Sequence, residues 1–158
     1  ALMSEDTFYL EAMLDGGLSP NDGKNGDSPL LEKAVISGTL DHVKLLVERG
    51  ADTDAKSGLV GRTAFDLSTS GTKSKVALYL LEHSDQPNVR TGTGVTTAWR
   101  VHSRIQDLQP GSLQNDFIQL RDRMIQRGVE FPPPSPVEVR EQMRAEGLTP
   151  RVPPGHDH

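Results

Sequence analysis

A short pattern that recurs along the chain limits its possible folds more than any other feature of the sequence. At four places an aliphatic residue is followed three positions later by a small residue, which is glycine in three of the four cases. The pairs are Leu14 and Gly17, Val47 and Gly50, Leu81 and Ser84, and Ile125 and Gly128. Glycine at such a point adopts the left-handed conformation that ends a helix. The pattern therefore predicts several short helices of similar design.

A second signal follows each of the first three pairs, where glycine stands two residues before Ser or Thr. These sites are Gly26 with Ser28, Gly61 with Thr63, and Gly94 with Thr96. A Ser or Thr hydroxyl caps the N-terminus of a helix, and Pro29 is predicted at the first helical position after Ser28. The three glycines lie 35 and 33 residues apart. Start and stop signals at this spacing predict a repeat of two helices.

The repeat resembles the ankyrin repeat family, whose unit has about 33 residues and a Thr-Pro-Leu-His signature. The best match covers 28–30 and 40–52, followed by 63–67 and 76–83. The first unit lacks its opening half, and the fourth carries extra residues around 107–116 that we expect to form a projecting loop. The resemblance covers about residues 5–131. It implies an all-α helical repeat solenoid.

This sequence departs from the family pattern at the signature histidine. Its place is taken by Leu31, Asp66 or Trp99, so we do not expect the hydrogen bond that this histidine usually makes between repeats. The apolar pattern itself fits stacked helices, because Val43, Leu46 and Val47 share one helical face. One helix pair is too small to bury such a face alone. Neighbouring units must complete the core, and the terminal units must differ from the rest.

The C-terminal part of the sequence differs from the repeats in being rich in proline. Residues 131–134 cannot be helical and favour polyproline II, as a rigid connector or, alternatively, as an SH3-type ligand. Ser135 and Glu138 form a capping box with Pro136 at the first helical position, so a helix should run to Glu146 and end at Gly147. We divide the chain into a repeat array (1–131, units about 5–25, 26–60, 61–93 and 94–131), a connector with a capping helix (132–148), and a flexible tail (149–158).

Composition excludes several functions. The chain of 158 residues has 17 basic and 22 acidic residues, a net charge of −5, which argues against nucleic acid as the main ligand. It has no cysteine, so thiol chemistry is excluded. No apolar run reaches the length of about 18 residues needed for a membrane span. The acidic start has no signal peptide; we interpret Ala1 and Leu2 as a cloning remnant before Met3 and expect a cytoplasmic protein.

No residue pattern predicts catalysis. Gly92, Thr93 and Gly94 lack the lysine and spacing of a phosphate-binding loop. Asp52 and Asp54 lie in a turn after a helix, and Lys73 to Lys75 are interpreted as a solvated turn rather than a catalytic pair. A metal site at 156–158 is weighed and set aside, because a terminal tripeptide has little preorganisation. We therefore expect no enzyme activity, no metal and no cofactor.

The resemblance implies a binding surface on the loop tips and on the exposed side of the first helices. Carried over by position, the candidate residues are Lys24, Asn25, Asp27, Ile36, Ser37, Leu59, Val60, Arg62, Thr69, Ser70, Arg90, Thr93, Val95, Trp99, Ser103 and Arg104. Leu59 and Val60 either stay exposed for a partner or fold onto the next repeat. Trp99 is either a binding anchor or fills a gap beneath the last repeat.

The expected function is protein–protein binding through a preformed concave face, by a chain that is monomeric when free. A specific version is a bacterial immunity or antitoxin-type inhibitor, whose acidic surface would attract a basic toxin or enzyme. The alternatives are a general scaffold or adaptor and, from another class, a small enzyme whose site we do not recognise.

Overall fold

The computed structural model describes residues 5–21 and 29–152. Within these ranges all regular structure is helical, and pairing between extended segments is limited to the isolated bridges Ser57–Arg62 and Arg90–Thr96. The helices are α1 (Glu5–Asp15), α2 (Leu30–Ser37), α3 (Leu40–Glu48), α4 (Ala64–Ser68), α5 (Ser74–His83), α6 (Thr97–Asp107), α7 (Ser112–Gln126) and α8 (Pro136–Ala145). The expected all-α repeat solenoid is confirmed.

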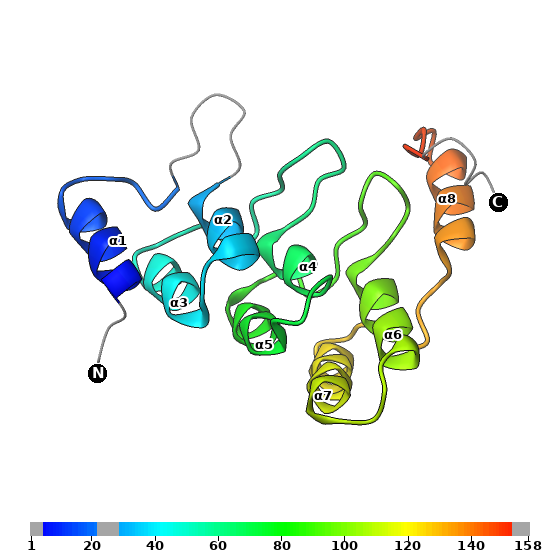
Figure 1. Cartoon of the computed structure of the whole chain (residues 1–158). Helices are drawn as coiled ribbons and strands as arrows, with labels where there is room; N and C mark the ends of the chain where they lie inside the picture. Colours follow the sequence, from blue (N-terminus) through cyan, green and yellow to red (C-terminus); the bar gives the residue numbers. More distant parts are fainter. Residues whose placement is uncertain (1–4, 22–28, 153–158) are drawn as a thin grey trace.

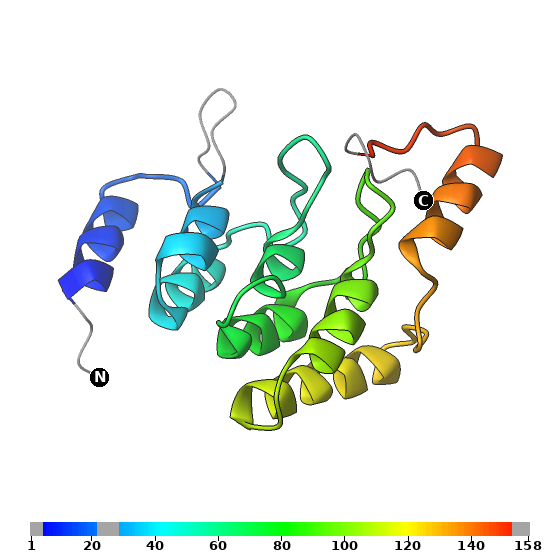
Figure 2. The ribbon, with the colours of Figure 1, turned by 45° about the vertical axis from the view of Figure 1, so that its right-hand side comes forward.

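The helices form two parallel rows (Figure 1). We call α2, α4 and α6 the inner helices, and α1, α3, α5 and α7 the outer helices. Each inner helix packs on the outer helix that follows it in sequence, and α3 packs on both α1 and α5. Figure 2 shows the same progression from α1 at one end to α8 at the other. None of the helices in the described ranges is both long and apolar enough to span a membrane.

The predicted helix starts are confirmed at two of three sites that the repeat defines. Thr63 accepts a hydrogen bond from the Asp66 backbone N–H, and Thr96 accepts one from that of Trp99. Ser28 lies outside the described residues. The placement of Pro29 was wrong by one residue: its ψ of 151° is extended, so Pro29 is the N-cap and Leu30 begins the helix.

Glycine ends the outer helices where the repeat predicts it. Gly17, Gly50 and Gly128 have φ values of 103°, 91° and 89°, in the left-handed region that only glycine enters without strain. Ser84, the non-glycine member of the series, is instead extended, with φ of −98°. Each outer helix therefore ends in the conformation that the residue at its stop allows, left-handed at glycine and extended at serine.

One continuous core runs through the units. It includes Val43, Phe65, Leu80 and Phe117, each fully buried, and it extends from Leu14 to Met124. Fully burying each such side chain contributes about 1.5–3 kcal/mol relative to leaving it exposed. Because the core crosses every boundary between units, stacking of neighbouring units contributes to the stability of the array.

The extra residues of the fourth unit do not form the projecting loop that we expected. Helix α6 continues to Asp107, and α7 begins at Ser112 and has 15 residues. The Gln114 side-chain amide closes the short turn by donating to the carbonyls of Ile105 and Leu108. The insertion therefore lengthens two packed helices and adds no large loop to the binding face.

Two extended loops, or fingers, project beside the inner helices (Figure 1). Finger A comprises residues 53–62 and finger B residues 86–96. The Gly92 N–H donates to the Val60 carbonyl at 2.8 Å, and the Arg151 N–H donates to the Gly92 carbonyl at 2.7 Å. Backbone hydrogen bonds thus join finger A, finger B and the segment after α8.

Helix α8 begins with the predicted capping box of Ser135 and Glu138. It lies beside finger B at the end of the array (Figures 1 and 2). Arg140 Nε donates to the Thr93 carbonyl at 2.9 Å, and Arg90 forms an ion pair with Glu146 at 2.8 Å. Val139 and Met143 are buried but do not belong to the main core. This helix therefore caps the finger side of the last unit.

Candidate functional site

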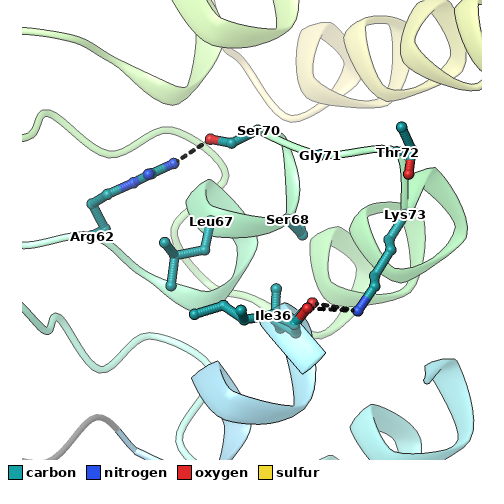
Figure 3. Close-up of a pocket in the computed structure, with 9 residues that line it drawn as sticks. Ile36, Arg62, Leu67, Ser68, Ser70, Gly71, Thr72 and Lys73 are labelled. Carbon is teal, nitrogen blue, oxygen red and sulfur yellow. Dashed lines mark hydrogen bonds between the residues drawn. The ribbon is translucent and has the colours of Figure 1, made fainter. Parts of the chain in front are cut away.

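A groove of about 400 Å³ opens on the side of the inner helices (Figure 3). Its lining residues are Val35, Ile36, Arg62, Leu67, Ser68, Ser70, Gly71, Thr72 and Lys73. They come from the end of α2, the base of finger A, helix α4 and the turn that follows α4. We call this surface, together with the exposed parts of fingers A and B and of α6, the inner face.

Ile36 and Leu67 supply the apolar part of the groove. Ile36 is 62% exposed, so most of this aliphatic side chain is accessible to a partner. Leu67 is half-buried and packs against the core. A concave site with apolar walls and a few polar groups is the common form of a binding site.

Arg62 connects finger A with α4. Its guanidinium forms an ion pair with the Asp66 carboxylate, and Nη2 donates to the Asp66 carbonyl at 2.9 Å and to Ser70 Oγ at 2.6 Å. The Arg62 side chain is 20% exposed, whereas that of Asp66 is fully buried. These bonds hold the base of finger A against α4 and fix one wall of the groove.

Lys73 fixes the opposite wall. Its Nζ donates to the carbonyls of Val35, Ile36 and Gly38, at 3.0, 3.0 and 2.8 Å. These carbonyls end α2, where the helix dipole attracts a positive charge. The interpretation of Lys73 as part of a solvated turn was therefore wrong.

Asp66 lies at the centre of a polar cluster beneath the groove. Thr97 Oγ1 donates to Asp66 Oδ1 at 2.9 Å, and Arg100 Nε lies 3.3 Å from the same oxygen. Burial lowers the pKa of Arg100, while the Asp66 carboxylate acts in the opposite direction. Asp66 stands at the signature-histidine position, and its carboxylate makes a side-chain hydrogen bond between repeats that the sequence analysis did not predict.

The structure places the candidate residues in very different surroundings. Ile36, Ser37, Leu59, Ser70 and Arg90 are exposed. Seven are half-buried, namely Val60, Arg62, Thr93, Val95, Trp99, Ser103 and Arg104. Thr69 is 1% exposed and donates through Oγ1 to the Asp66 carbonyl, so its side chain cannot reach a partner. Lys24, Asn25 and Asp27 lie outside the described residues.

The two residues at the tip of finger A differ in exposure. Leu59 is 85% exposed, whereas Val60 is half-buried and its carbonyl is bonded to finger B. Trp99 is half-buried, lies 5.7 Å from the His102 ring between centroids, and is not part of the main core. The anchor and gap-filling roles of Trp99 both stay predictions.

Finger B is already in contact with the C-terminal segment. Arg90, Thr93 and Gly92 bond to Glu146, Arg140 and Arg151, as described above. The accessible part of the inner face is therefore centred on the groove and finger A.

Sequence reasoning missed Leu67, Lys73 and Arg100. Two signals were available for the Asp66 cluster: Arg62 precedes Asp66 by four residues, and Arg100 follows it by 34, close to one repeat length. In the described ranges no group of three or more His, Asp or Glu side chains could hold a metal ion. The sequence at 156–158 lies outside those ranges.

Helix pairs stacked in two rows, with fingers beside the inner row, define the ankyrin type of repeat solenoid. The comparisons agree with this class. The chain is 36% identical over 98 residues to the BTB/POZ domain and ankyrin repeat-containing protein COCH of Pisum sativum, an alignment covering 61% of this chain and 19% of that protein. It is 33% identical over 60 residues to the NF-kappa-B inhibitor cactus of Drosophila melanogaster, covering 38% of this chain and 12% of cactus.

A third relative is the regulatory protein NPR5 of Arabidopsis thaliana, 35% identical over 98 residues, which are 61% of this chain and 19% of NPR5. No protein-family model matches the chain. The matched segments span a fifth or less of these relatives. The resemblance to ankyrin-repeat proteins is confirmed, and none of the three relatives is named as an enzyme.

Proposed function

We propose that this chain binds another protein through the groove and finger A. The observation that carries the proposal is the exposure of Ile36 in a groove with hydrogen-bonded walls. An aliphatic side chain left in water forgoes about 1.5–3 kcal/mol of burial, which a partner would recover. Leu59, at 85% exposure on the tip of finger A, offers a second such contact.

The walls of this site are preformed. Lys73 holds the end of α2, and Arg62 holds finger A on α4, so few groups need to be ordered when a partner binds. Ordering a flexible side chain costs about 0.5–1.5 kcal/mol at an interface. Stiffness of the array therefore supports binding without any covalent chemistry.

We further propose that binding inhibits the partner, as in an immunity or antitoxin-type protein. Cactus is named as an inhibitor and NPR5 as a regulatory protein, which supports a regulatory role for a similar array. The net charge of −5 was the reason to expect a basic toxin or enzyme as the partner. The groove gives no local support for that charge preference, because its charged lining residues are Arg62 and Lys73.

Capture of partners with matched variants tests the proposed face. The double variant Ile36→Asp with Leu59→Asp should lose the proteins that the unchanged chain retains from a lysate of its source cells. Ile125→Asp is the control, because Ile125 is 47% exposed on the outer helix α7. Substitutions at such exposed positions usually change the free energy of unfolding by no more than about 0.5 kcal/mol.

Retention of the same proteins by the double variant would show that the binding face is misplaced. Arg62→Glu is not a suitable test, because Arg62 pairs with the buried Asp66 and its loss would disturb the fold. Once a partner enzyme is identified, its activity with and without the chain separates an inhibitor from a scaffold or adaptor.

A further inference from the structure

The groove has a local charge opposite to that of the whole protein. Its charged lining residues are both cationic, Arg62 and Lys73, and no carboxylate is among its described lining residues. The chain as a whole has a net charge of −5. A site whose charge opposes the net charge favours one sign of ligand at short range.

The Asp66 cluster increases this positive charge. Two guanidinium groups, those of Arg62 and Arg100, contact the single carboxylate of Asp66. The negative partner is fully buried, whereas the Arg62 and Arg100 side chains are 20% and 25% exposed. Solvent and any partner therefore meet the cationic side of the cluster.

Arg100 has capacity for a further ligand. Among the described residues its contact with Asp66 is an ion pair through Nε, which is buried and makes no hydrogen bond, and its terminal nitrogens have no hydrogen-bond partner; the side chain is 25% exposed. A guanidinium with open terminal nitrogens is suited to bidentate binding of a carboxylate. Lys73 is different, because its ammonium group already donates to three carbonyls.

The same chain shows how a carboxylate docks on this side of the array. Glu146 of α8 receives two hydrogen bonds from Arg90 of finger B, at 3.1 and 2.8 Å. The carboxylate of a helix residue thus accepts a bidentate pair of hydrogen bonds from an arginine of finger B. Arg62 lines the groove beside Ile36 and Leu67, and Arg100 of α6 adjoins Arg62 through their shared contact with Asp66, so the two guanidinium groups offer similar chemistry at this edge of the groove.

We infer that the partner segment bound by this groove is acidic, with an aliphatic side chain against Ile36 and Leu67 and a carboxylate on Arg62 and Arg100. This inference rests on the proposed function and specifies the chemistry of its partner. It concerns the bound segment alone, so the overall charge of the partner protein can have either sign.

Fluorescence polarisation with the full chain tests this chemistry directly. The probes are three labelled peptides of about twelve residues with one central leucine, flanked by Glu, by Gln or by Lys. The Glu peptide should bind at least about tenfold more tightly than the Gln peptide, and the Lys peptide should not bind. Raising NaCl from about 50 mM to about 300 mM should weaken binding of the Glu peptide, because salt screens exposed charges.

Variants locate the binding site. Arg100→Gln should lower the affinity for the Glu peptide about fivefold or more. Arg121→Gln should leave this affinity unchanged, since Arg121 lies on the outer helix α7 beside Asp122. Ile36→Asp should weaken it as well, without removing any arginine. This second variant keeps the test valid if Arg100→Gln proves unstable in thermal unfolding.

Equal binding of the Gln peptide, absence of any peptide binding, or equal losses from Arg100→Gln and Arg121→Gln would each overturn the inference. Partner capture that depends on Ile36 and Leu59 would then still support the proposed function. Retention of the same proteins by the Ile36→Asp, Leu59→Asp variant, by contrast, would contradict the proposed binding face itself.

Discussion

Asp66 of α4 accepts a hydrogen bond from Thr97 of α6, with 2.9 Å between Thr97 Oγ1 and Asp66 Oδ1. The bond crosses from the third to the fourth repeat, and both residues are fully buried. Thr97 Oγ1 also accepts a hydrogen bond from the Val89 N–H at 3.1 Å. One carboxylate and one hydroxyl therefore tie α4, α6 and finger B together.

Removing the Asp66 carboxylate should be strongly destabilising. Asp66→Ala leaves the guanidinium groups of Arg62 and Arg100 close together without their counter-ion, and breaking a buried ion pair in this way costs about 3–5 kcal/mol. Urea denaturation should show the loss. Asp85→Ala is the control: Asp85 is exposed, and a change below about 0.5 kcal/mol is expected. Similar stabilities of the two variants would contradict the role assigned to Asp66.

Lys73 and Lys75 are two positions apart in the sequence, but their substitution should change the stability of the fold by different amounts. Lys73→Met removes the donor to the three carbonyls at the end of α2 and should cost about 1–2 kcal/mol. Lys75 has a side chain that is 70% exposed and one ion pair, so Lys75→Met should cost less than about 0.5 kcal/mol. Thermal unfolding of the two variants compares them directly, and equal midpoints would argue against capping by Lys73.

Gly94 should tolerate a methyl group less well than Gly50. Both have positive φ, 79° and 91°, so alanine is strained at either position. A Cβ at Gly94 would also lie 2.6 Å from Arg140 Cγ and 3.3 Å from the Pro136 carbonyl oxygen, whereas nothing lies within 4 Å at Gly50. Gly94→Ala should therefore loosen α8 and increase proteolysis between 131 and 146, while Gly50→Ala should not. Equal cleavage of both variants would mean that α8 does not depend on this close approach.

Stability should depend on pH through Asp116 of α7. The hydrogen bond from Ser74, followed by that from Lys75, lowers the pKa of Asp116 below its ordinary value. Because the folded pKa is depressed, this contribution is complete above the unfolded value of about 3.9 and is lost as the pH falls through the folded pKa. The stability difference between the unchanged chain and Asp116→Asn should stay constant at neutral pH and shrink below about pH 4. Denaturation series at several pH values measure it, and a difference that persists to pH 2 would exclude this linkage.

Local signals in the sequence predicted much of the fold. The capping roles of Thr63, Thr96 and Ser135 depend on the residue and the turn that follows, so they are visible without tertiary structure. The stop at Gly50 is equally local. The position of α8 beside finger B was not predicted, because it depends on contacts such as that between Arg140 and Thr93, which are 47 residues apart.

The candidate site was predicted less completely. The repeat pattern indicated the region that contains Ile36, Leu59 and Arg62, because equivalent positions of a repeat occupy equivalent places. It could not show that Thr69 turns inward or that Lys73 reaches back to Gly38, a contact between residues 35 positions apart. Both outcomes depend on how closely neighbouring units pack.

The hydrogen bond from the Arg151 N–H to the Gly92 carbonyl has a practical consequence for handling the protein. It holds the backbone after α8 against the edge of finger B, so a linker attached at Arg151 would lie beside that edge. Helix α1 stands at the opposite end of the array (Figure 1). Immobilisation through a residue of α1 would therefore leave finger B and its contacts with α8 unobstructed in a biosensor or bead assay.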